Sequence, residues 1–370
     1  MSAVQPAGVG SPAEPPATAA DRPVVLAVDG NSIVHRSFHA LAGTGLRSAD
    51  GRPMWAVRGL LSQIVTAAER VGPAAIVIGF DDPDASVRRD RWPQYKAHRE
   101  DKLETLVSQL AWAAQVLAEL GLCVVVPPGL EADDVLAATA DVARRAGART
   151  VVMTSDRDSF ALIDDNTSVL RIINGGVDAS PMLTPERLVT LTGVRPEQYR
   201  DYAALRGDPS DNLPGVRGFG PKTAAKLLQT LGSARAAFED VRGEGTRVRE
   251  AVGPALAARL ADPASREAWE LNCRVMSFVA EVDLSLSLDA GPGVLPVPAD
   301  AVRAVFTLQQ LPSTLPYALR ALAHVQVEGP APILASERAW SDVPRRSWGG
   351  QRYARLPAKP PQSEQLALFG

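Results

Sequence analysis

The chain has 370 residues, 46% of them hydrophobic and 22% charged, and its net charge is −3. These values are typical of a globular protein with one large domain or two ordinary ones, and the lack of any apolar run near roughly 20 residues argues against a membrane-spanning protein. The net charge argues only weakly against a nucleic-acid partner, because a site built of carboxylates would mask basic patches elsewhere. Two cysteines, Cys123 and Cys273, are too few for a disulfide framework or a cysteine-based zinc site, which favours a reducing cytoplasm.

Residues 1–22 are rich in Pro, Ala and Gly, carry no secretion signal, and are predicted to be a disordered tail. From residue 23 onward, short apolar runs alternate with amphipathic stretches. The apolar runs predict strands over 24–28, 75–78, 123–126, 150–153 and 169–172. The amphipathic stretches predict helices near 54–70, 102–120 and 134–146. Strands that alternate with helices form a mostly parallel sheet covered on both faces, so the predicted fold class is α/β.

Beyond about residue 184 the strand pattern stops and helical patterns follow. Helices are predicted near 185–192, 196–206, 221–231, 244–261 and 264–276, with one or two more within 292–325. We therefore expect a core domain over 23–190 and a helical subdomain over 191–325. Residues 326–370 are rich in Pro and Arg without periodicity, and they are predicted to be a second disordered tail.

Acidic side chains follow four of the predicted strands. They are Asp29, Asp81, Glu131, Asp133, Asp134, Asp156 and Asp158. Any one of them could be a turn or helix-capping residue. Because the carboxyl ends of parallel strands meet at one edge of a sheet, however, all of them should face one crevice, where like charges need compensation. No matching set of lysines or arginines sits beside them in the sequence. Ligands that are all oxygens favour Mg²⁺ or Mn²⁺, and a pair of such ions suits phosphodiester hydrolysis.

The stretch GDPSDNLPGVRGFGPKTA over 207–224 is rich in glycine. It is not a P-loop, because Pro221 stands where glycine must precede the lysine and no strand leads in. Gly215, Gly218 and Gly220 free the backbone to curl, so that its N–H groups can point at a phosphate at the start of the next helix. The alternative is a plain glycine-rich turn between two helices.

Charged side chains flank this hairpin on both sides. Lys222 and Lys226 lie one turn apart on the following helix and could follow the same DNA strand. Asp208 and Asp211 lie on the approach and would add two more carboxylates to the acidic crevice.

A basic stretch, SVRRDRWPQYKAHREDK over 86–102, interleaves arginines and lysines with Trp92 and Tyr95. Cations that alternate with aromatic rings are what a channel for single-stranded nucleic acid requires. The alternative is a solvated basic loop.

Together these motifs resemble the 5′→3′ exonuclease and flap endonuclease family, which includes the N-terminal nuclease domain of bacterial DNA polymerase I and its free-standing relatives. The resemblance covers about residues 23–310, and the glycine-rich motif at 207–224 carries it most specifically. It implies a PIN-like nuclease core with a helical arch over about 82–112. It also implies a helix–three-turn–helix element over 193–232 that grips duplex DNA and a K⁺ ion.

The same resemblance implies roles for individual side chains. It assigns the tighter of two or more Mg²⁺ or Mn²⁺ ions to Asp29, Asp81, Glu131, Asp133 and Asp156. It assigns the second ion to Asp158, Asp208 and Asp211, with Asp134 in the surrounding shell. The implied catalytic cations are Lys96, Arg99 and Arg88. The implied DNA contacts are Arg89, Tyr95, Gly215, Gly218, Gly220, Lys222, Thr223 and Lys226. Val87 and Ser155 depart from the family pattern, which usually has an aromatic residue and a glycine there.

The implied function is structure-specific cleavage of DNA at a 5′ flap, a nick or a 5′ end, in replication and repair, by a cytoplasmic, nucleoid-associated monomer. One alternative is a PIN-type ribonuclease, which would lack the element over 193–232. The other is a non-catalytic DNA-binding protein, which would have no reason to keep so many unpaired acids.

The chain ends in PPQSEQLALFG. Gln365, Leu366, Leu368 and Phe369 match the Gln-Leu-x-Leu-Phe pattern by which bacterial replication and repair proteins dock on the sliding clamp. Apolar side chains would fill a pocket on the clamp while the glutamine donates and accepts hydrogen bonds. The alternative is an apolar tail with no partner.

Overall fold

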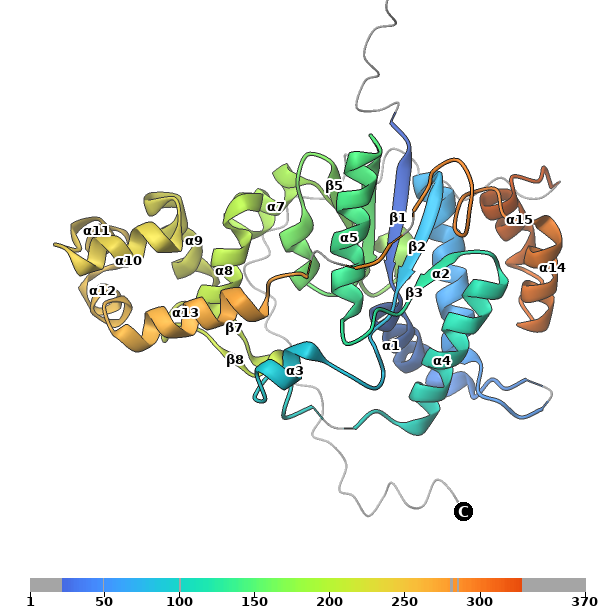
Figure 1. The fold of residues 1–370 in the computed structure, drawn as a ribbon, viewed down its shortest axis with the longest axis horizontal. Coiled ribbons are helices and arrows are strands. Elements are labelled where there is room, and N and C mark those ends of the chain that lie inside the picture. Colours follow the sequence, from blue (N-terminus) through green and yellow to red (C-terminus); the bar gives the residue numbers. More distant parts are fainter. Residues whose placement is uncertain (1–21, 49, 100, 280–281, 285, 328–370) are drawn as a thin grey trace, which may run out of the picture. The chain divides into compact units, whose positions relative to one another are not determined.

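A sheet of six strands lies at the centre of the region that the computed structural model describes, residues 22–327 except 49, 100, 280, 281 and 285 (Figure 1). The strands are β1 (Val24–Asp29), β2 (Ala75–Gly79), β3 (Cys123–Val125), β4 (Arg149–Thr154), β5 (Thr167–Arg171) and β6 (Met182–Leu183). Their order is β3-β2-β1-β4-β5-β6, and every neighbouring pair is parallel except β5 and β6. The predicted α/β class with a mostly parallel sheet is confirmed.

The strand order reverses at β1, which pairs with β2 on one side and with β4 on the other. Val25 is opposite Ala75 in β2 and Thr150 in β4, so the three strands end level with one another. In open α/β sheets, the crevice at such a reversal is the usual place for a ligand. The register therefore collects the residues that follow β1, β2 and β4 at one edge of the sheet.

Helices cover both faces of the sheet, which is why every residue of β1 and β2 is buried. One face carries α1 (Gly30–Leu41), α2 (Trp55–Val71) and α4 (Glu104–Glu119), whose side chains share one apolar core with the sheet. The other face carries α5 (Ala132–Arg145), which packs on β1, β2 and β4. A side chain at Gly79 would collide with Val135, so this glycine lets α5 approach the end of β2.

A second apolar core holds the helices that follow the sheet. They are α7 (Pro185–Thr192), α8 (Tyr199–Arg206), α9 (Pro221–Leu231), α10 (Ala234–Arg242), α11 (Thr246–Val252), α12 (Pro254–Leu260) and α13 (Pro263–Val275). Between α8 and α9, the short strands β7 (Gly207–Asp208) and β8 (Leu213–Pro214) form an antiparallel ribbon. Two further short helices occur in the connections of the sheet: α3 (Val87–Arg91) follows β2 in the chain, and α6 (Gly176–Ala179) follows β5.

Several predicted elements differ from the observed ones. The helix predicted over 244–261 is two helices, because Gly253 has a φ of +86° and Pro254 starts a new helix there. The strand predicted over 169–172 spans 167–171, so it starts two residues earlier and ends one residue earlier. Helices α1 and α10 were not predicted.

The segment over 292–325 packs on the apolar core that the sheet shares with α1, α2 and α4, and the expectation that it would complete the helical subdomain does not hold. It forms α14 (Ala299–Leu308) and α15 (Leu315–Ala323), and Phe306 is fully buried in the same core as α2. Arg320 of α15 donates hydrogen bonds to Glu69 of α2, and the amide of Ile76 donates to the carbonyl of Gly293. In the described part of the chain, none of the helices is both long enough and apolar enough to cross a bilayer.

Candidate active site

Asp29 ends β1 and is 5% exposed. Its Oδ1 accepts a hydrogen bond from the Ser32 amide (2.9 Å) and caps α1, while its Oδ2 accepts one from the Thr154 hydroxyl (2.7 Å). Each carboxylate oxygen therefore has one donor and keeps lone pairs for a further partner. The cap explains why a helix begins directly after the strand.

Asp81 follows β2 and joins two helix starts. Its Oδ1 accepts a hydrogen bond from the Ala132 amide at the start of α5 (3.0 Å), and its Oδ2 accepts one from the Asn31 side chain (2.6 Å). Asn31 in turn accepts from the Asp81 amide (3.0 Å). Asp81 is thus held beside Asp29 through α1 and beside Asp133 through α5.

The start of α5 supplies three acids with different surroundings. Asp133 accepts a hydrogen bond from the Ser159 hydroxyl (3.1 Å). Glu131 accepts from the Lys96 ammonium (2.8 Å), the Tyr95 hydroxyl (3.1 Å) and the Arg88 guanidinium (3.1 Å). Asp134, which is fully buried, accepts from both terminal nitrogens of Arg88 at 2.7 Å and from two backbone amides.

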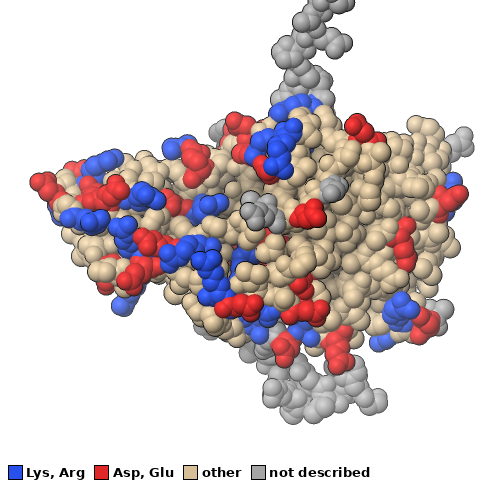
Figure 2. Space-filling model, viewed as in Figure 1, with Lys and Arg blue, Asp and Glu red and all other residues tan. Residues whose placement is uncertain are grey.

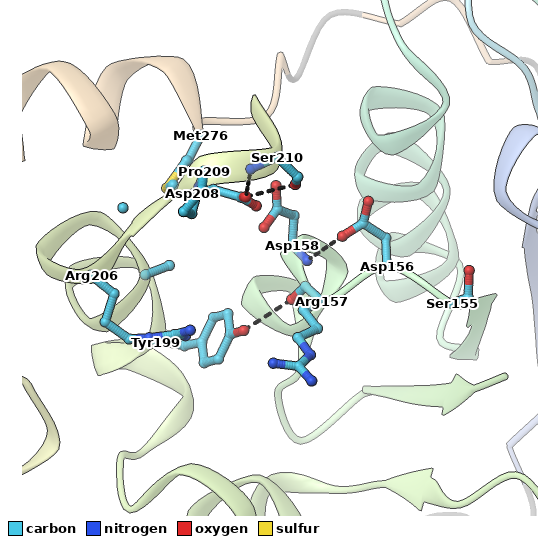
Figure 3. Close-up of a pocket in the computed structure, with 12 residues that line it drawn as sticks. Ser155, Asp156, Arg157, Asp158, Tyr199, Arg206, Asp208, Pro209, Ser210 and Met276 are labelled. Atoms are coloured by element: carbon cyan, nitrogen blue, oxygen red, sulfur yellow. Dashed lines mark hydrogen bonds between the residues drawn. The ribbon is translucent and has the colours of Figure 1, made fainter. Parts of the chain in front are cut away.

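Asp158, Asp208 and Asp211 converge, each with one carboxylate oxygen within 4.8 Å of the others. Asp158 follows β4 and Asp208 ends β7 (Figure 3), whereas Asp211 lies in the turn between β7 and β8. Asp208 is fixed by Ser210, whose amide and hydroxyl both donate to it. The ribbon is tight, because a side chain at Gly215 would collide with the Arg206 carbonyl. Among the described residues, no other acidic trio meets this closely.

Burial and mutual repulsion destabilise the ionised form of several carboxyl groups in the crevice and so raise their pKa values. Burial, with repulsion from Asp156 and Asp81, raises the pKa of Asp29 to about 7. Burial, with repulsion from Asp156 and the two ribbon acids, raises the pKa of Asp158 to about 8. The same two causes raise the pKa of Asp133 well above its ordinary value. These carboxylates therefore lack sufficient counter-charge from the chain.

The expectation that no cations sit beside the acids is wrong in part. Lys96 pairs with Glu131, and Arg99 pairs with Asp211. Burial alone would lower the pKa of Lys96, but Glu131 and Asp211 raise it above its ordinary value, so the ammonium stays charged. The two cations come from the basic stretch at 86–102, which the sequence places far from either acid.

Arg88 and Tyr95 are both buried, which changes the roles expected for them. Arg88 donates to Asp134, to Glu131 and to the carbonyls of Val275 and Ser277, so every part of its guanidinium is engaged within the protein. Tyr95 is 5% exposed and packs with Leu213 and Val275, so its ring is not free to stack on a base. Both residues therefore hold the acids of the site in place. The oxygens of Asp134 are taken by Arg88 and backbone amides.

Only part of the predicted arch is helical. Helix α3 carries the exposed Arg89, turns follow to about residue 99, and α4 begins at Glu104. Arg91 stacks over the Trp92 ring at 5.0 Å. The basic stretch therefore reaches the acids through Lys96 and Arg99 on non-helical backbone.

The glycine-rich hairpin joins α8 to α9 as predicted. Gly218 and Gly220 are exposed, and Gly218 has a φ of +90°, which favours glycine. Lys222 and Lys226 are exposed on α9, and Thr223 between them is half-buried. On the face shown in Figure 2, Lys and Arg side chains are concentrated over this helical region, with acids interleaved.

Hydroxyl and amide side chains that the sequence analysis did not select hold the acids in place. The side chains of Asn31, Thr154 and Ser159 donate to Asp81, Asp29 and Asp133, and the backbone amide of Ser32 also donates to Asp29. They flank the acids in DGNS and TSDRDS, so their place beside the strand ends could have identified them. Ser155 bonds to Ser32 through its amide (3.0 Å), which bridges the ends of β4 and β1.

The donor set fits divalent cations. It consists of carboxylate oxygens, and those of Asp158, Asp208 and Asp211 converge. The pKa values of Asp29 and Asp158 are raised, and a bound cation would supply the positive charge that stabilises their ionised forms. The predicted clamp-binding residues 365–369 lie outside the described residues, as do both predicted tails apart from residues 22, 326 and 327.

An acidic crevice at the strand reversal of an α/β sheet, with a lysine and an arginine against it, defines the class of metal-dependent nucleases. The chain belongs to the 5′-3′ exonuclease family. Residues 24–193 match the model of its N-terminal resolvase-like domain, and residues 194–292 match the model of its C-terminal SAM-fold domain. The second match covers the helical region that a PIN-type ribonuclease would lack.

Curated relatives are DNA polymerases. The chain is 39% identical over 240 residues to DNA polymerase I of Mycobacterium bovis, covering 65% of this chain and 26% of the relative. It is 37% identical over 261 residues to the thermostable DNA polymerase I of Thermus aquaticus, covering 70% and 30%. The chain thus spans less than a third of the length of these relatives.

Solved structures share the fold. The zinc-bound T5 5′-exonuclease superposes with a TM-score of 0.56 at 19% identity, over 79% of this chain and 98% of that one. The catalytic core of Rad2 in complex with DNA substrate superposes with a TM-score of 0.52 at 17% identity, over 82% and 92%.

Proposed function

We propose that the chain hydrolyses phosphodiester bonds of DNA at 5′ ends, nicks and 5′ flap junctions. The observation that carries this proposal is the convergence of Asp158, Asp208 and Asp211 beside the strand-end acids. Asp29, Asp81, Glu131, Asp133 and Asp156 would hold one divalent cation, and the converging trio would hold the second. Bound Mg²⁺ or Mn²⁺ would supply the nucleophile's activation and the counter-charge that phosphodiester hydrolysis needs.

The chain's own groups have distinct tasks in this proposal. Lys96 and Arg99 are held at the crevice by ion pairs with Glu131 and Asp211. In the complex with DNA, a scissile phosphate could replace these acids as the partner of the two cations. The exposed hairpin at Gly215, Gly218 and Gly220 would bind the duplex backbone through its N–H groups, with Lys222, Thr223 and Lys226 of α9 beside it and a K⁺ ion at the same element. Arg89 is the exposed cation of α3 available to the 5′ strand.

Supporting features are the family membership, the raised pKa values of the carboxyls, and the helical region beside the crevice. We also propose that the protein acts as a monomer near the nucleoid, and that residues 365–369 bind a sliding clamp.

The test is cleavage mapping on a 5′ flap, a nicked duplex and a blunt duplex, each with a labelled 5′ strand. Cleavage should need Mg²⁺ or Mn²⁺, should release the label first, and should occur at the junction of the flap. A matching RNA duplex is the control, because a PIN-type ribonuclease would prefer it. Metal-dependent DNA binding without cleavage would favour the non-catalytic alternative.

A further inference from the structure

A cavity of about 380 Å³ lies between the end of β4 and the end of α8 (Figure 3). One wall carries the carboxylates of Asp156, Asp158 and Asp208, and the lining also includes two arginines, Arg157 and Arg206. Tyr199 and Met276 add less polar surface between them. The cavity lining therefore contains both carboxylates and guanidinium groups.

Neither arginine has a carboxylate partner within the described residues. The guanidinium carbon of Arg206 lies over the Tyr202 ring, 4.9 Å from its centroid. Arg157 is exposed, and its carbonyl accepts a hydrogen bond from the Tyr199 hydroxyl at 3.0 Å. Figure 3 shows the Tyr199 ring between Arg206 and Arg157, with its hydroxyl pointing toward Arg157.

A stacked arginine with no acid partner is well suited to bind a phosphate. The ring restricts the side chain, so less entropy is lost when a ligand binds, and the planar fork can donate two parallel hydrogen bonds. The site also continues into the hairpin. Gly207 follows Arg206 directly and begins the ribbon that carries Asp208 and leads to Gly215.

We propose that Arg206, assisted by Arg157, binds a backbone phosphate of the cleaved DNA strand between the hairpin and the metal-binding acids. This inference rests on the proposed function and adds a specific contact to it. A strand held by the hairpin at one end and cleaved at the acids must pass this cavity. Its phosphate would be repelled by the aspartates and attracted by the arginines, which sets how far the strand advances. Arg206 is thus a positioning residue.

The experiment couples a protein change to a DNA change. Flap substrates carry one neutral methylphosphonate at each of the first four phosphates on the duplex side of the cleavage point. Affinity is measured by fluorescence anisotropy in Ca²⁺ with the parent, Arg206→Gln and Arg206→Lys. Arg200→Gln is the matched control, because Arg200 is exposed on the same helix and does not line the cavity.

One methylphosphonate position should weaken parent binding by about tenfold and leave Arg206→Gln almost unaffected, because the contact is already lost. Arg206→Lys should recover part of the affinity, and Arg200→Gln should behave as the parent. Equal effects of every methylphosphonate on parent and Arg206→Gln would overturn the inference. The inference would also be overturned if thymidine 5′-monophosphate binds in an Arg206-dependent way while no methylphosphonate position shows an effect that depends on Arg206. The cavity would then bind a free nucleotide. If the parent cleaves flaps, either result leaves the proposed function standing.

Discussion

Asp133 and Asp156 come from different strand ends, and the charge of Asp156 is one of the causes that raise the pKa of Asp133. We predict that Asp133→Asn or Asp156→Asn abolishes cleavage while DNA binding survives or tightens. A lost ligand removes stabilisation of the transition state, and the basic contacts to DNA remain. Flap cleavage and anisotropy on the same preparations provide the check. Cleavage within about tenfold of the parent at saturating Mg²⁺ would refute these assignments.

The pKa of Asp158, raised by burial and by its acidic neighbours to about 8 against an ordinary 3.8, makes the metal-free protein sensitive to pH. Between the ordinary pKa of 3.8 and the raised pKa of about 8, the folded state keeps a proton that the unfolded chain releases. The free energy of unfolding of the metal-free protein therefore falls as the pH rises between these two values. We predict that Asp158→Asn raises the Tm in EDTA at pH 8 by about 2–4 °C and has less effect at pH 5. Saturating Mg²⁺ should reverse the order of parent and variant at pH 8. If the Tm difference between parent and variant in EDTA is the same at pH 5 and at pH 8, the raised pKa of Asp158 is contradicted.

Arg88 links three elements that lie far apart in the sequence. It joins α3 to the start of α5 through Asp134 and to the end of α13 through the Val275 carbonyl. We predict that Arg88→Met lowers the free energy of unfolding by about 3–5 kcal/mol, because Asp134 would keep a buried, unpaired charge. Urea unfolding measures this, with the exposed Arg89→Met as control. The double variant Arg88→Met with Asp134→Leu should lose less than the single variant, and a larger loss would contradict the pairing.

We propose that the hairpin and α9 bind the DNA duplex. We predict that Lys222→Ala weakens binding to duplex-containing flaps of any sequence and lowers the slope of log affinity against log salt by about 1. The cleavage rate at saturating enzyme should change less. Arg145→Ala is the control, since Arg145 lies in the last turn of α5, paired with Asp141. Unchanged affinity at about 0.15 M salt would show that Lys222 has only a local role in its helix.

The sequence was sufficient for the elements whose periodicity is local. The five parallel strands and the acids that follow them could be predicted because a strand end determines where the next residue lies, whereas the two-residue strand β6 was missed. Helix α1 was missed because Gly30 and Asn31 look like a turn, although Asp29 caps a helix there. The place of 292–325 could not be predicted, because its apolar faces fit either core.

The site was predictable in its residue types and less so in its pairings. The partners of Arg88 lie 43 to 189 positions away in the chain, and no local pattern reports them. Cations in a basic stretch look alike in sequence. Only the fold separates the buried Arg88 from the exposed Arg89 and from Lys96 at the crevice.

At the scale of the whole molecule, we propose that residues 365–369 bind a partner independently of the nuclease site. We predict that Leu366→Ala combined with Phe369→Ala abolishes association with a sliding clamp and leaves cleavage of free flaps intact. Clamp pull-down and flap cleavage on the same variant test both halves, with Lys359→Ala as a control in the same segment. Retention of the clamp by the double variant as well as by the parent would end this proposal.

The central claim is that the carboxylates at the strand ends hold divalent cations that cut DNA at a 5′ structure. The most direct measurement is a metal titration of the parent on a 5′-labelled flap, with Asp158→Asn in parallel. We predict no cleavage in EDTA, cleavage at the flap junction that rises and saturates with Mg²⁺ or Mn²⁺, and a variant that needs far more metal or stays inactive. Cleavage that persists in EDTA, or a parent that binds the flap and leaves it intact at every metal concentration, would contradict the claim.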